Sequence, residues 1–195
     1  MEAIATGLGL SSSAGLNAYL PLVIYNLAVH LGFIEVEGKL PETMASWEAL
    51  GVFTILLIIE MIVDKVPLLD SVNDIINTAI RPATGAALMV ASTSPLQENF
   101  SPELVQLFAI ISGGTSAGGV HAVKALGRPL ITGSTAGTGN FMVSFLEDVL
   151  ALGVSLFAIL LPFIILFLGV GTLLLGLWWI WELQRRDMVK RQYLR

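Results

Sequence analysis

The sequence predicts an all-α protein, a polytopic bundle of about six transmembrane helices. Of its 195 residues, 55% are hydrophobic and only 13% are charged, whereas soluble domains carry about 25% charged residues. The mean hydropathy is +0.81. Several apolar runs approach the roughly 20 residues that a spanning helix needs, and one small soluble core could not bury them all. We therefore expect residues 1–183 to form a single transmembrane helical domain, followed by a basic cytoplasmic tail, 184–195.

The composition also excludes several classes of function. The chain has no cysteine, so it forms no disulfide and no thiolate site. Its two histidines, His30 and His121, argue against a multi-histidine metal centre. The first residues lack the basic region of a signal peptide, so no cleavage is expected. We expect membrane lipids as partners, and neither nucleic acid nor a cofactor.

Apolar runs give the helices in order. Between them, loops rich in charge, Pro, Gly or Ser are predicted at 35–41, 64–70, 92–102 and 128–140. The predicted segments are 4–33, 47–63, 71–91 and 104 to about 126, with a fifth and a sixth sharing 141–183.

The first segment is too long for one upright helix, and its first half is small and polar. It contains Gly7, Gly9, Ser11, Ser12, Ser13, Gly15 and Asn17, with Pro21 behind them. This composition is typical either of close helix packing through small residues or of a broken helix that opens onto a cavity. Packing is the favoured interpretation, because such interfaces are common in membrane bundles, and the broken helix is the alternative.

The third segment carries a polar stripe. At about 100° per residue, the polar residues of this segment fall within about 60° of one line. Ionisable groups in hydrocarbon cost at least about 2.5–3.5 kcal/mol each, so the stripe must face the bundle interior. A helix cap cannot explain Arg81, which lies about 16 Å of helix beyond Asp70. The stripe consists of Asp70, Asn73, Asp74, Asn77, Arg81 and Thr84.

The fifth segment repeats this spacing 74 positions later. Ser144, Glu147, Asp148 and Ser155 occupy the places of Asp70, Asn73, Asp74 and Arg81. The acidic turns would lie at similar depth, and their carboxylates would repel unless a cation, a proton or Arg81 intervened. Such repulsion is a physical basis for proton coupling. The equally weighted alternative is that these acids only cap the first helical turns.

Two isolated polar residues have two interpretations each. Glu60 either ends the second segment near the membrane interface or faces the polar interior. His121 fits a packed, hydrogen-bonded residue better than a metal ligand, because no second histidine lies near it in sequence.

A second repeat relates residues 11–18 to 115–122 and places Asn17 opposite His121. Under the predicted topology the two stretches run in opposite directions, as inverted repeats do in transporter folds. The glycine-rich stretches 112–119 and 133–140 predict anion-binding nests or a re-entrant loop. Neither ends in Gly-Lys-Ser/Thr, so nucleotide binding is not indicated.

Basic residues predict the sidedness. The tail after Leu183 holds five of the ten Lys and Arg residues, and Lys65, Lys124 and Arg128 lie at or near the loops 64–70 and 128–140. Cytoplasmic loops are enriched in Lys and Arg, so six crossings with both termini in the cytoplasm are expected. Residues 149–181 contain no charge. The stretch 141–183 is therefore either a hairpin, broken at Pro162 or at Gly169 and Gly171, or one long bent helix.

Motifs along nearly the whole chain are similar to those of a known family. They are 7–22 (GLGLSSSAGLNAYLPL), 64–67 (DKVP) with 70–74 (DSVND), 80–85 (IRPATG), 119–121, 128–130, 134–140 and Glu147-Asp148. In these stretches the chain resembles domain of unknown function 4126, an uncharacterised family of bacterial and plastid membrane proteins. The resemblance implies a multi-pass protein of the bacterial inner membrane and supplies neither an activity nor catalytic residues.

These patterns together predict a small transporter or channel and not an enzyme, because no nucleophile elbow, zinc motif or paired histidines are present. A small cation, or a proton-coupled solute, would follow a polar path lined by segments one, three, four and five. Small-residue faces favour a homodimer. The rival prediction is a non-transporting scaffold, assembly factor or lipid-organising protein whose polar stripe is a folding lock. The predicted substrate- or ion-binding residues are Asp70, Asn73, Asp74, Asn77, Arg81, Glu147, Asp148, Asn17 and His121.

Overall fold

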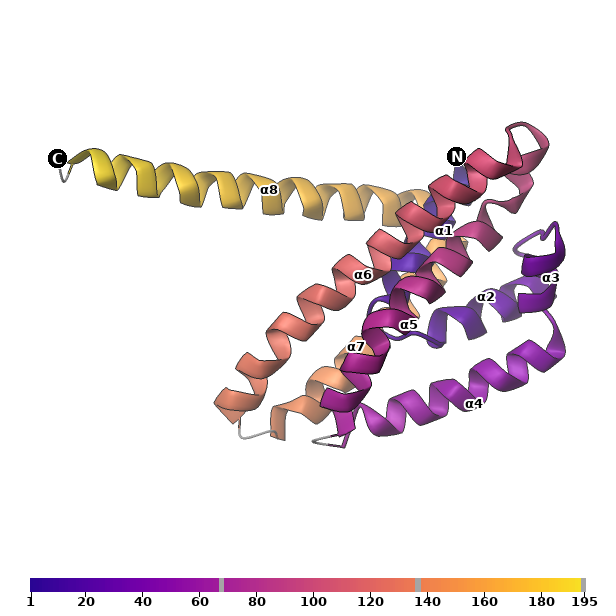
Figure 1. The fold of residues 1–195 in the computed structure, drawn as a ribbon, viewed down its shortest axis with the longest axis horizontal. Coiled ribbons are helices and arrows are strands. Elements are labelled where there is room, and N and C mark those ends of the chain that lie inside the picture. Colours follow the sequence, from indigo (N-terminus) through magenta and orange to yellow (C-terminus); the bar gives the residue numbers. More distant parts are fainter. Residues whose placement is uncertain (67–68, 136–137, 194–195) are drawn as a thin grey trace.

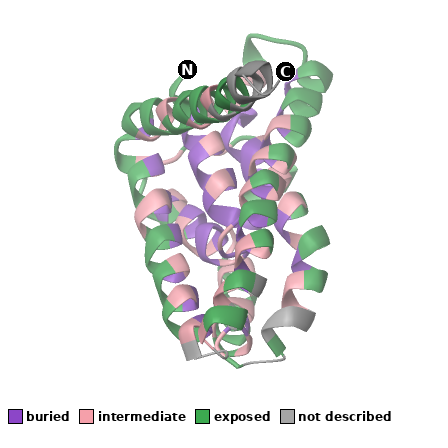
Figure 2. Cartoon of the chain, turned by 90° about the vertical axis from the view of Figure 1, so that its left-hand side faces the viewer, coloured by how far each residue is buried: buried purple, intermediate pink, exposed green. Residues whose placement is uncertain are grey.

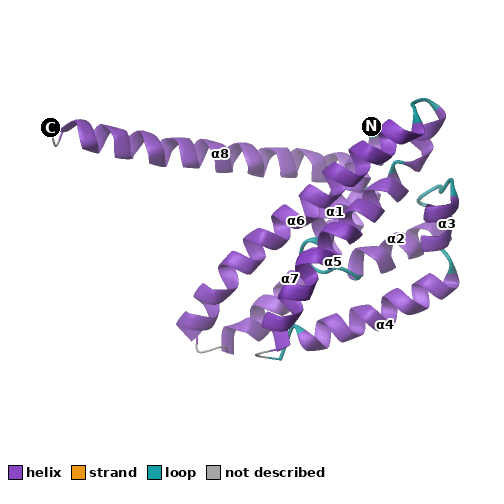
Figure 3. Cartoon of the chain, in the orientation of Figure 1, coloured by secondary structure: helices purple, strands orange, loops and turns teal. Residues whose placement is uncertain are grey.

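The computed structural model describes residues 1–66, 69–135 and 138–193, without the side chains of 70–72, 129, 132, 138, 183 and 187–193. In this part of the chain all regular structure is helical (Figure 3), which confirms the all-α class. The elements, labelled in Figure 1, are α1 (Glu2–Ala14), α2 (Leu20–His30), α3 (Lys39–Met44), α4 (Trp47–Val63), α5 (Leu69–Ser92), the 3-10 helix η1 (Ser94–Glu98), α6 (Pro102–Thr135), α7 (Thr138–Leu160) and α8 (Pro162–Tyr193).

Helices α5 and α6 form an antiparallel pair that packs through glycine. A Cβ atom on Gly85 would lie 2.5 Å from Ala117 Cβ and 2.6 Å from the Gly113 carbonyl oxygen. The two backbones therefore meet with no room for a side chain on Gly85, as small residues allow in helical bundles.

Helix α1 lies in the middle of the bundle. Its small residues touch α5, α6 and α7, because a Cβ on Gly7 would meet Met89, one on Gly9 would meet Ala158 and one on Gly15 would meet Val120. Figure 2 shows the buried residues gathered in the bundle interior, while the outer faces of the surrounding helices are largely exposed. The predicted small-residue packing of the first segment is present.

The first segment is also broken, so its two interpretations hold together. Helix α1 ends at Ala14 and α2 begins at Leu20. Residues 15–19, which we call the helix break, lie inside the bundle. From there α2 runs back beside α4: the Ala18 amide meets Glu60 near the end of α4, whereas Asn26 meets the Ser46 carbonyl at its start. Helices α1 and α2 therefore form a pair that turns back inside the bundle instead of one continuous helix.

This arrangement corrects the predicted directions. Ser12 contacts Ser116, and the Leu16 carbonyl accepts a hydrogen bond from Lys124, so α1 runs parallel to α6. The predicted opposite orientation of 11–18 and 115–122 is wrong. Figure 1 shows the N-terminus at the end of the bundle opposite to the C-terminal end of α4. The N-terminus and the loop after α4, which holds Lys65, therefore lie at opposite ends of the bundle, whereas the predicted six-crossing topology has them at the same end.

Helix α6 is longer than predicted. It continues through the glycine-rich stretch 112–119 without a break and ends at Thr135, so residues 128–135 are helical and not a loop. The predicted nest or re-entrant loop at 112–119 is absent, because the stretch stays helical and Gly113 makes a close contact with the backbone of Gly85 in α5. Most of 133–140 is helical as well, and residues 136–137 lie outside the described residues.

The stretch 141–183 is two helices, and the break falls at Leu161 and Pro162 as one alternative predicted. Proline at the first helical position costs no hydrogen bond. Helix α8 does not lie along α7 but leaves the bundle (Figure 1), and Ile165 near its start lies beside Gly9 of α1. In the described residues, two helical stretches, Gly139–Leu160 and Pro162–Arg186, are long and apolar enough to cross a membrane.

Candidate functional site

Charged side chains gather inside the bundle next to the helix break. Four helices or their ends supply them: α4, α5, α6 and α7. Four of these side chains are cationic and five are carboxylates. Each of the five carboxylates has an oxygen within 3.6 Å of a cationic nitrogen. We call this group the charged cluster; its members are Glu60, Asp64, Lys65, Asp74, Arg81, Lys124, Arg128, Glu147 and Asp148.

The helix break is held at both of its backbone ends by this cluster. A helix leaves carbonyl groups without partners at its C-terminus and amides at its N-terminus. At the end of α1, the Gly15 carbonyl accepts from Arg81 Nη1 (3.2 Å) and the Leu16 carbonyl from Lys124 Nζ (3.1 Å). Just before α2, the Ala18 amide donates to both carboxylate oxygens of Glu60, at 3.0 and 3.2 Å. Cations thus meet the negative end of α1 and an anion meets the positive end of α2.

Asn17 explains why the chain turns here. Its Oδ1 accepts hydrogen bonds from the amides of Tyr19 (3.2 Å) and Leu20 (2.9 Å), which is the function of a helix N-cap side chain. Its Nδ2 donates to Asp148 Oδ1 at 3.0 Å. Pro21 follows in the first turn of α2, where proline is tolerated.

Arg81 joins the break to α4 and α6. Its side chain is fully buried. Besides Gly15, Arg81 contacts Glu60 Oε1 (Nη2, 3.0 Å) and His121 Nδ1 (Nη1, 3.0 Å). Glu60 Oε1 also accepts from Asn77 Nδ2 at 3.2 Å. Of the two interpretations of Glu60, the one that places it in the polar interior is correct.

Asp64, which directly follows α4, is the most connected carboxylate. It accepts from Asn73 Nδ2 (2.6 Å) and lies 3.2 Å from Lys124 Nζ and 3.6 Å from nitrogens of Arg81 and Arg128. Burial alone would raise the pKa of this carboxyl. Lys124, the hydrogen bond from Asn73, Arg128 and Arg81 together outweigh burial, so the pKa of Asp64 lies below its usual value.

The carboxylates of α7 complete the cluster. Glu147 Oε2 lies 3.0 Å from both Lys124 Nζ and Arg128 Nη2, and Asp148 Oδ2 lies 2.8 Å from Lys65 Nζ. Because α7 begins at Thr138, these two residues lie well inside the helix. The alternative that they cap its first turn is wrong.

The predicted substrate- or ion-binding residues meet in this network with one exception, Asp70, whose side chain lies outside the described residues. Asp74 is the most loosely held: its Oδ2 lies 3.5 Å from Arg128 Nε, and its buried Oδ1 has no described hydrogen-bond partner. Sequence reasoning missed the part that Asp64, Lys65, Lys124 and Arg128 play, since it used the three cations for sidedness and assigned Asp64 to the loop 64–70. The available signal was their position within one or two helical turns of the ends of apolar runs, close enough for their side chains to reach the bundle interior.

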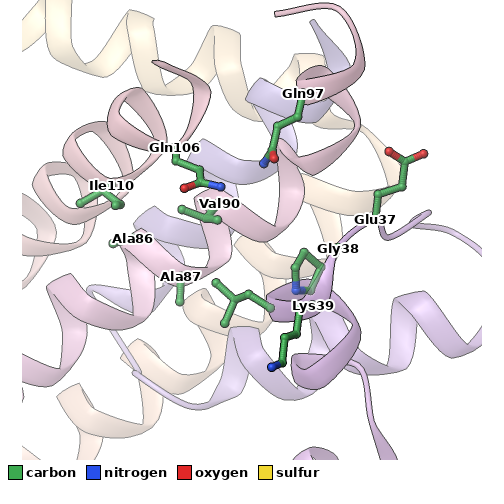
Figure 4. A pocket seen from close by; sticks show the side chains of 11 residues that line it. Glu37, Gly38, Lys39, Ala86, Ala87, Val90, Gln97, Gln106 and Ile110 are labelled. Atoms are coloured by element: carbon green, nitrogen blue, oxygen red, sulfur yellow. The ribbon is translucent and has the colours of Figure 1, made fainter. Parts of the chain in front are cut away.

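A pocket of about 420 Å³ lies elsewhere, between α3, η1, α5 and α6. Figure 4 shows the side chains of Gln97 and Gln106 above a floor formed by Ala86, Ala87 and Val90, with Glu37 and Lys39 at the rim. No member of the charged cluster lines it. Among the described residues, no three His, Asp or Glu side chains are grouped to hold a metal ion.

Comparison with known proteins gives one match. The family model described as "Domain of unknown function (DUF4126)" matches residues 4–182. The chain belongs to the DUF4126 family. The match covers the bundle and most of α8, so the helix break and the charged cluster lie inside the DUF4126 region. No curated protein and no solved structure matches the chain.

Proposed function

We propose that this DUF4126 protein is a small multi-pass membrane transporter that couples the movement of a solute to protons. Its surface supports a membrane location. Large apolar side chains are exposed along α4, α6, α7 and α8, including Ile55, Ile58 and Ile62 on one face of α4. Soluble monomers rarely expose contiguous apolar patches of this extent.

The proposed topology has five crossings and one re-entrant pair. Helices α4, α5, α6, α7 and α8 cross the membrane, and α1 and α2 enter it and return to the same side. Cytoplasmic segments are enriched in Lys and Arg, so the end with Lys65 and Arg128 faces the cytoplasm. The N-terminus is then outside, and the basic tail after α8 is inside.

The observation that carries the proposal is the helix break with charged side chains on both of its backbone ends. In transporters, discontinuous helices place backbone ends near the midplane, where they bind substrate or coupling ions. Here Arg81 and Lys124 occupy the carbonyls and Glu60 occupies the amide. A solute that binds these backbone groups would displace Arg81, Lys124 or Glu60 from them, and the helix break would move.

The pairing of the carboxylates favours proton coupling over binding of a bare cation. A metal cation bound to a carboxylate of the cluster would meet a Lys or Arg nitrogen within 3.5 Å of that carboxylate and would be repelled by it. A proton adds no separate ion to the cluster, and it changes the charge of the carboxylate directly.

Reconstitution tests this proposal. Proteoliposomes with an imposed pH gradient are exposed to pools of amino acids, organic acids, amines and sugars, and charge movement is recorded. We expect a proton-linked current with at least one pool, lost in Asp74→Asn and Glu147→Gln and kept in Glu182→Gln. Among the described residues, the Glu182 carboxylate pairs with Arg185 and Arg186 of the tail and not with the charged cluster. Currents equal to those of empty liposomes, or variants that keep full current at normal folded yield, would contradict it.

A second candidate, a non-transporting membrane protein with a structural lock, is favoured by the same pairing, since a network in which each carboxylate has a cationic neighbour can specify one arrangement of the helices. It predicts that Arg81→Ala lowers the amount of folded protein without changing flux per folded molecule. Transport predicts that flux per folded molecule falls as well.

A further inference from the structure

We propose that the ring nitrogen Nδ1 of His121 is the proton-binding atom of this transporter, and that its protonation releases the helix break from Arg81. The inference rests on the proposed function and names its coupling site.

The hydrogen-bond partners assign the present state of the ring. Arginine has donors only, so Nδ1 of His121, 3.0 Å from Arg81 Nη1, is an acceptor and carries no proton. The hydroxyl proton of Thr78 is donated to the Asp74 carbonyl (2.9 Å), which leaves Thr78 Oγ1 as an acceptor for Nε2, 3.2 Å away. The imidazole is therefore neutral, with its proton on Nε2.

A proton on Nδ1 is incompatible with the present position of Arg81. Two donors would face one another across 3.0 Å, and both groups would be positively charged. The nitrogen that would have to move, Nη1, is the one that holds the Gly15 carbonyl at 3.2 Å. Protonation of His121 therefore removes a contact that fixes the end of α1.

The Arg81 guanidinium has a second partner close by, the carboxylate of Asp64. Its Nε is buried and has no hydrogen-bond partner among the described residues, so the guanidinium does not use all its donors where it stands. Asp64 Oδ2 already lies 3.6 Å from Nη2. A small shift toward Asp64 exchanges one described partner for another within the charged cluster.

The charged groups that face the His121 ring come from three helices. From α5 the ring faces Arg81 and Asp74, and on α6 it faces Lys124. Helix α4 supplies Glu60 and Asp64 beyond Arg81. The helix break presents the Gly15 backbone to α6. Among the described side chains of α5, Asp74 is the carboxylate that faces the ring. Its Oδ1 has no hydrogen-bond partner in the described residues, and in this proposal the proton reaches the ring through it.

The chain is well suited to a direct test, because it has two histidines and no cysteine. The full chain is labelled with ¹⁵N-histidine, and His30→Gln assigns the two rings by NMR. A nitroxide on Leu16→Cys reports the mobility of the helix break, and one on Leu104→Cys, exposed on α6, is the reference. We expect His121 to show the Nε2–H tautomer at neutral pH. As its ring becomes charged on acidification, the Leu16 label should change from mainly immobile to mainly mobile, while the Leu104 label stays unchanged.

His121→Gln is the matched variant, since the glutamine oxygen still accepts from Arg81 but binds no proton at this pH. It should abolish the pH response of the Leu16 label, and His30→Gln should leave it intact. A pH response that survives in His121→Gln, a ring charged at neutral pH, or a ring that titrates without change at Leu16 would each overturn the proposal. These readouts need no solute. A pH response of the Leu16 label without solute flux would contradict the proposed transport and leave the assignment of His121 intact. Solute flux without a pH response of the label would contradict the assignment of His121 and leave the proposed transport intact.

Discussion

Arg81 combines complete burial with partners on three other parts of the chain: the Gly15 carbonyl, Glu60 of α4 and His121 of α6. A buried ion pair adds little net stability over an apolar pair, because desolvation offsets most of the attraction. Removing one partner has a different result, since the other charge remains buried without compensation.

We predict that Arg81→Ala destabilises the protein by about 3–5 kcal/mol, because Glu60 keeps two backbone contacts but loses its buried counter-charge. Thermal unfolding of purified protein in detergent measures this. The control is Arg186→Ala: Arg186 is exposed and pairs with Glu182 at 2.9 Å, so its loss should cost no more than about 0.5 kcal/mol. Equal melting temperatures for both variants would show that Arg81 is not a structural centre of the bundle.

Single side chains also show where sequence reasoning stops. The polar stripe could be predicted because the cost of a charge in hydrocarbon fixes the direction of a helical face, and Asn77, Arg81 and Thr84 are indeed buried. The pairing of Lys124 with Asp64 could not be predicted, because these residues are 60 positions apart and only the fold brings them together.

At the scale of elements, helix packing depends on glycines whose backbones touch. We predict that Gly85→Ala destabilises the α5–α6 pair by about 1–3 kcal/mol, since overpacking forces neighbours apart and the new Cβ would lie 2.6 Å from the Gly113 carbonyl. Gly119→Ala is the control on the same pair. A Cβ there meets nothing within 4 Å, and alanine is the better helix former by about 1 kcal/mol. If chemical or thermal unfolding ranks the two variants in the reverse order, the close crossing is not present in solution.

Element boundaries followed from the sequence where apolar runs end in charge or proline. The predicted 47–63 coincides with α4, and 71–91 lies within α5. Two boundaries did not follow. Residues 128–135 read as a loop but are helical, and Arg128 in this turn pairs with Glu147 of the next helix. The course of α1 and α2 had only an ambiguous local signal, because small residues with one asparagine serve both close packing and a helix break.

For the whole molecule, the proposed membrane topology depends on α1 and α2 turning back inside the bundle. Because α1 and α2 turn back at the charged cluster, the N-terminal part of α1 lies beside the end of α5 that leads into η1. The N-terminus is at the end of the bundle opposite to the C-terminal end of α4 (Figure 1). A single crossing by the first segment would place the N-terminus beside Lys65 instead. The two arrangements differ by one crossing, which labelling from one side of the membrane detects.

We predict that Glu2→Cys and Glu98→Cys react with a membrane-impermeant maleimide added to intact cells, and that Val66→Cys reacts only after permeabilisation. The chain has no cysteine of its own, so the unmodified protein is the zero-label control, and all three positions are exposed. The physical reason is the enrichment of cytoplasmic segments in Lys and Arg, which assigns the Lys65 end to the cytoplasm, together with the return of α2 beside α4. Glu98→Cys fixes the outer side independently of α1. If Glu2→Cys is protected with Val66→Cys while Glu98→Cys is labelled, the first segment crosses the membrane, the helix break is not a re-entrant tip, and solutes would have to reach the charged cluster by another route.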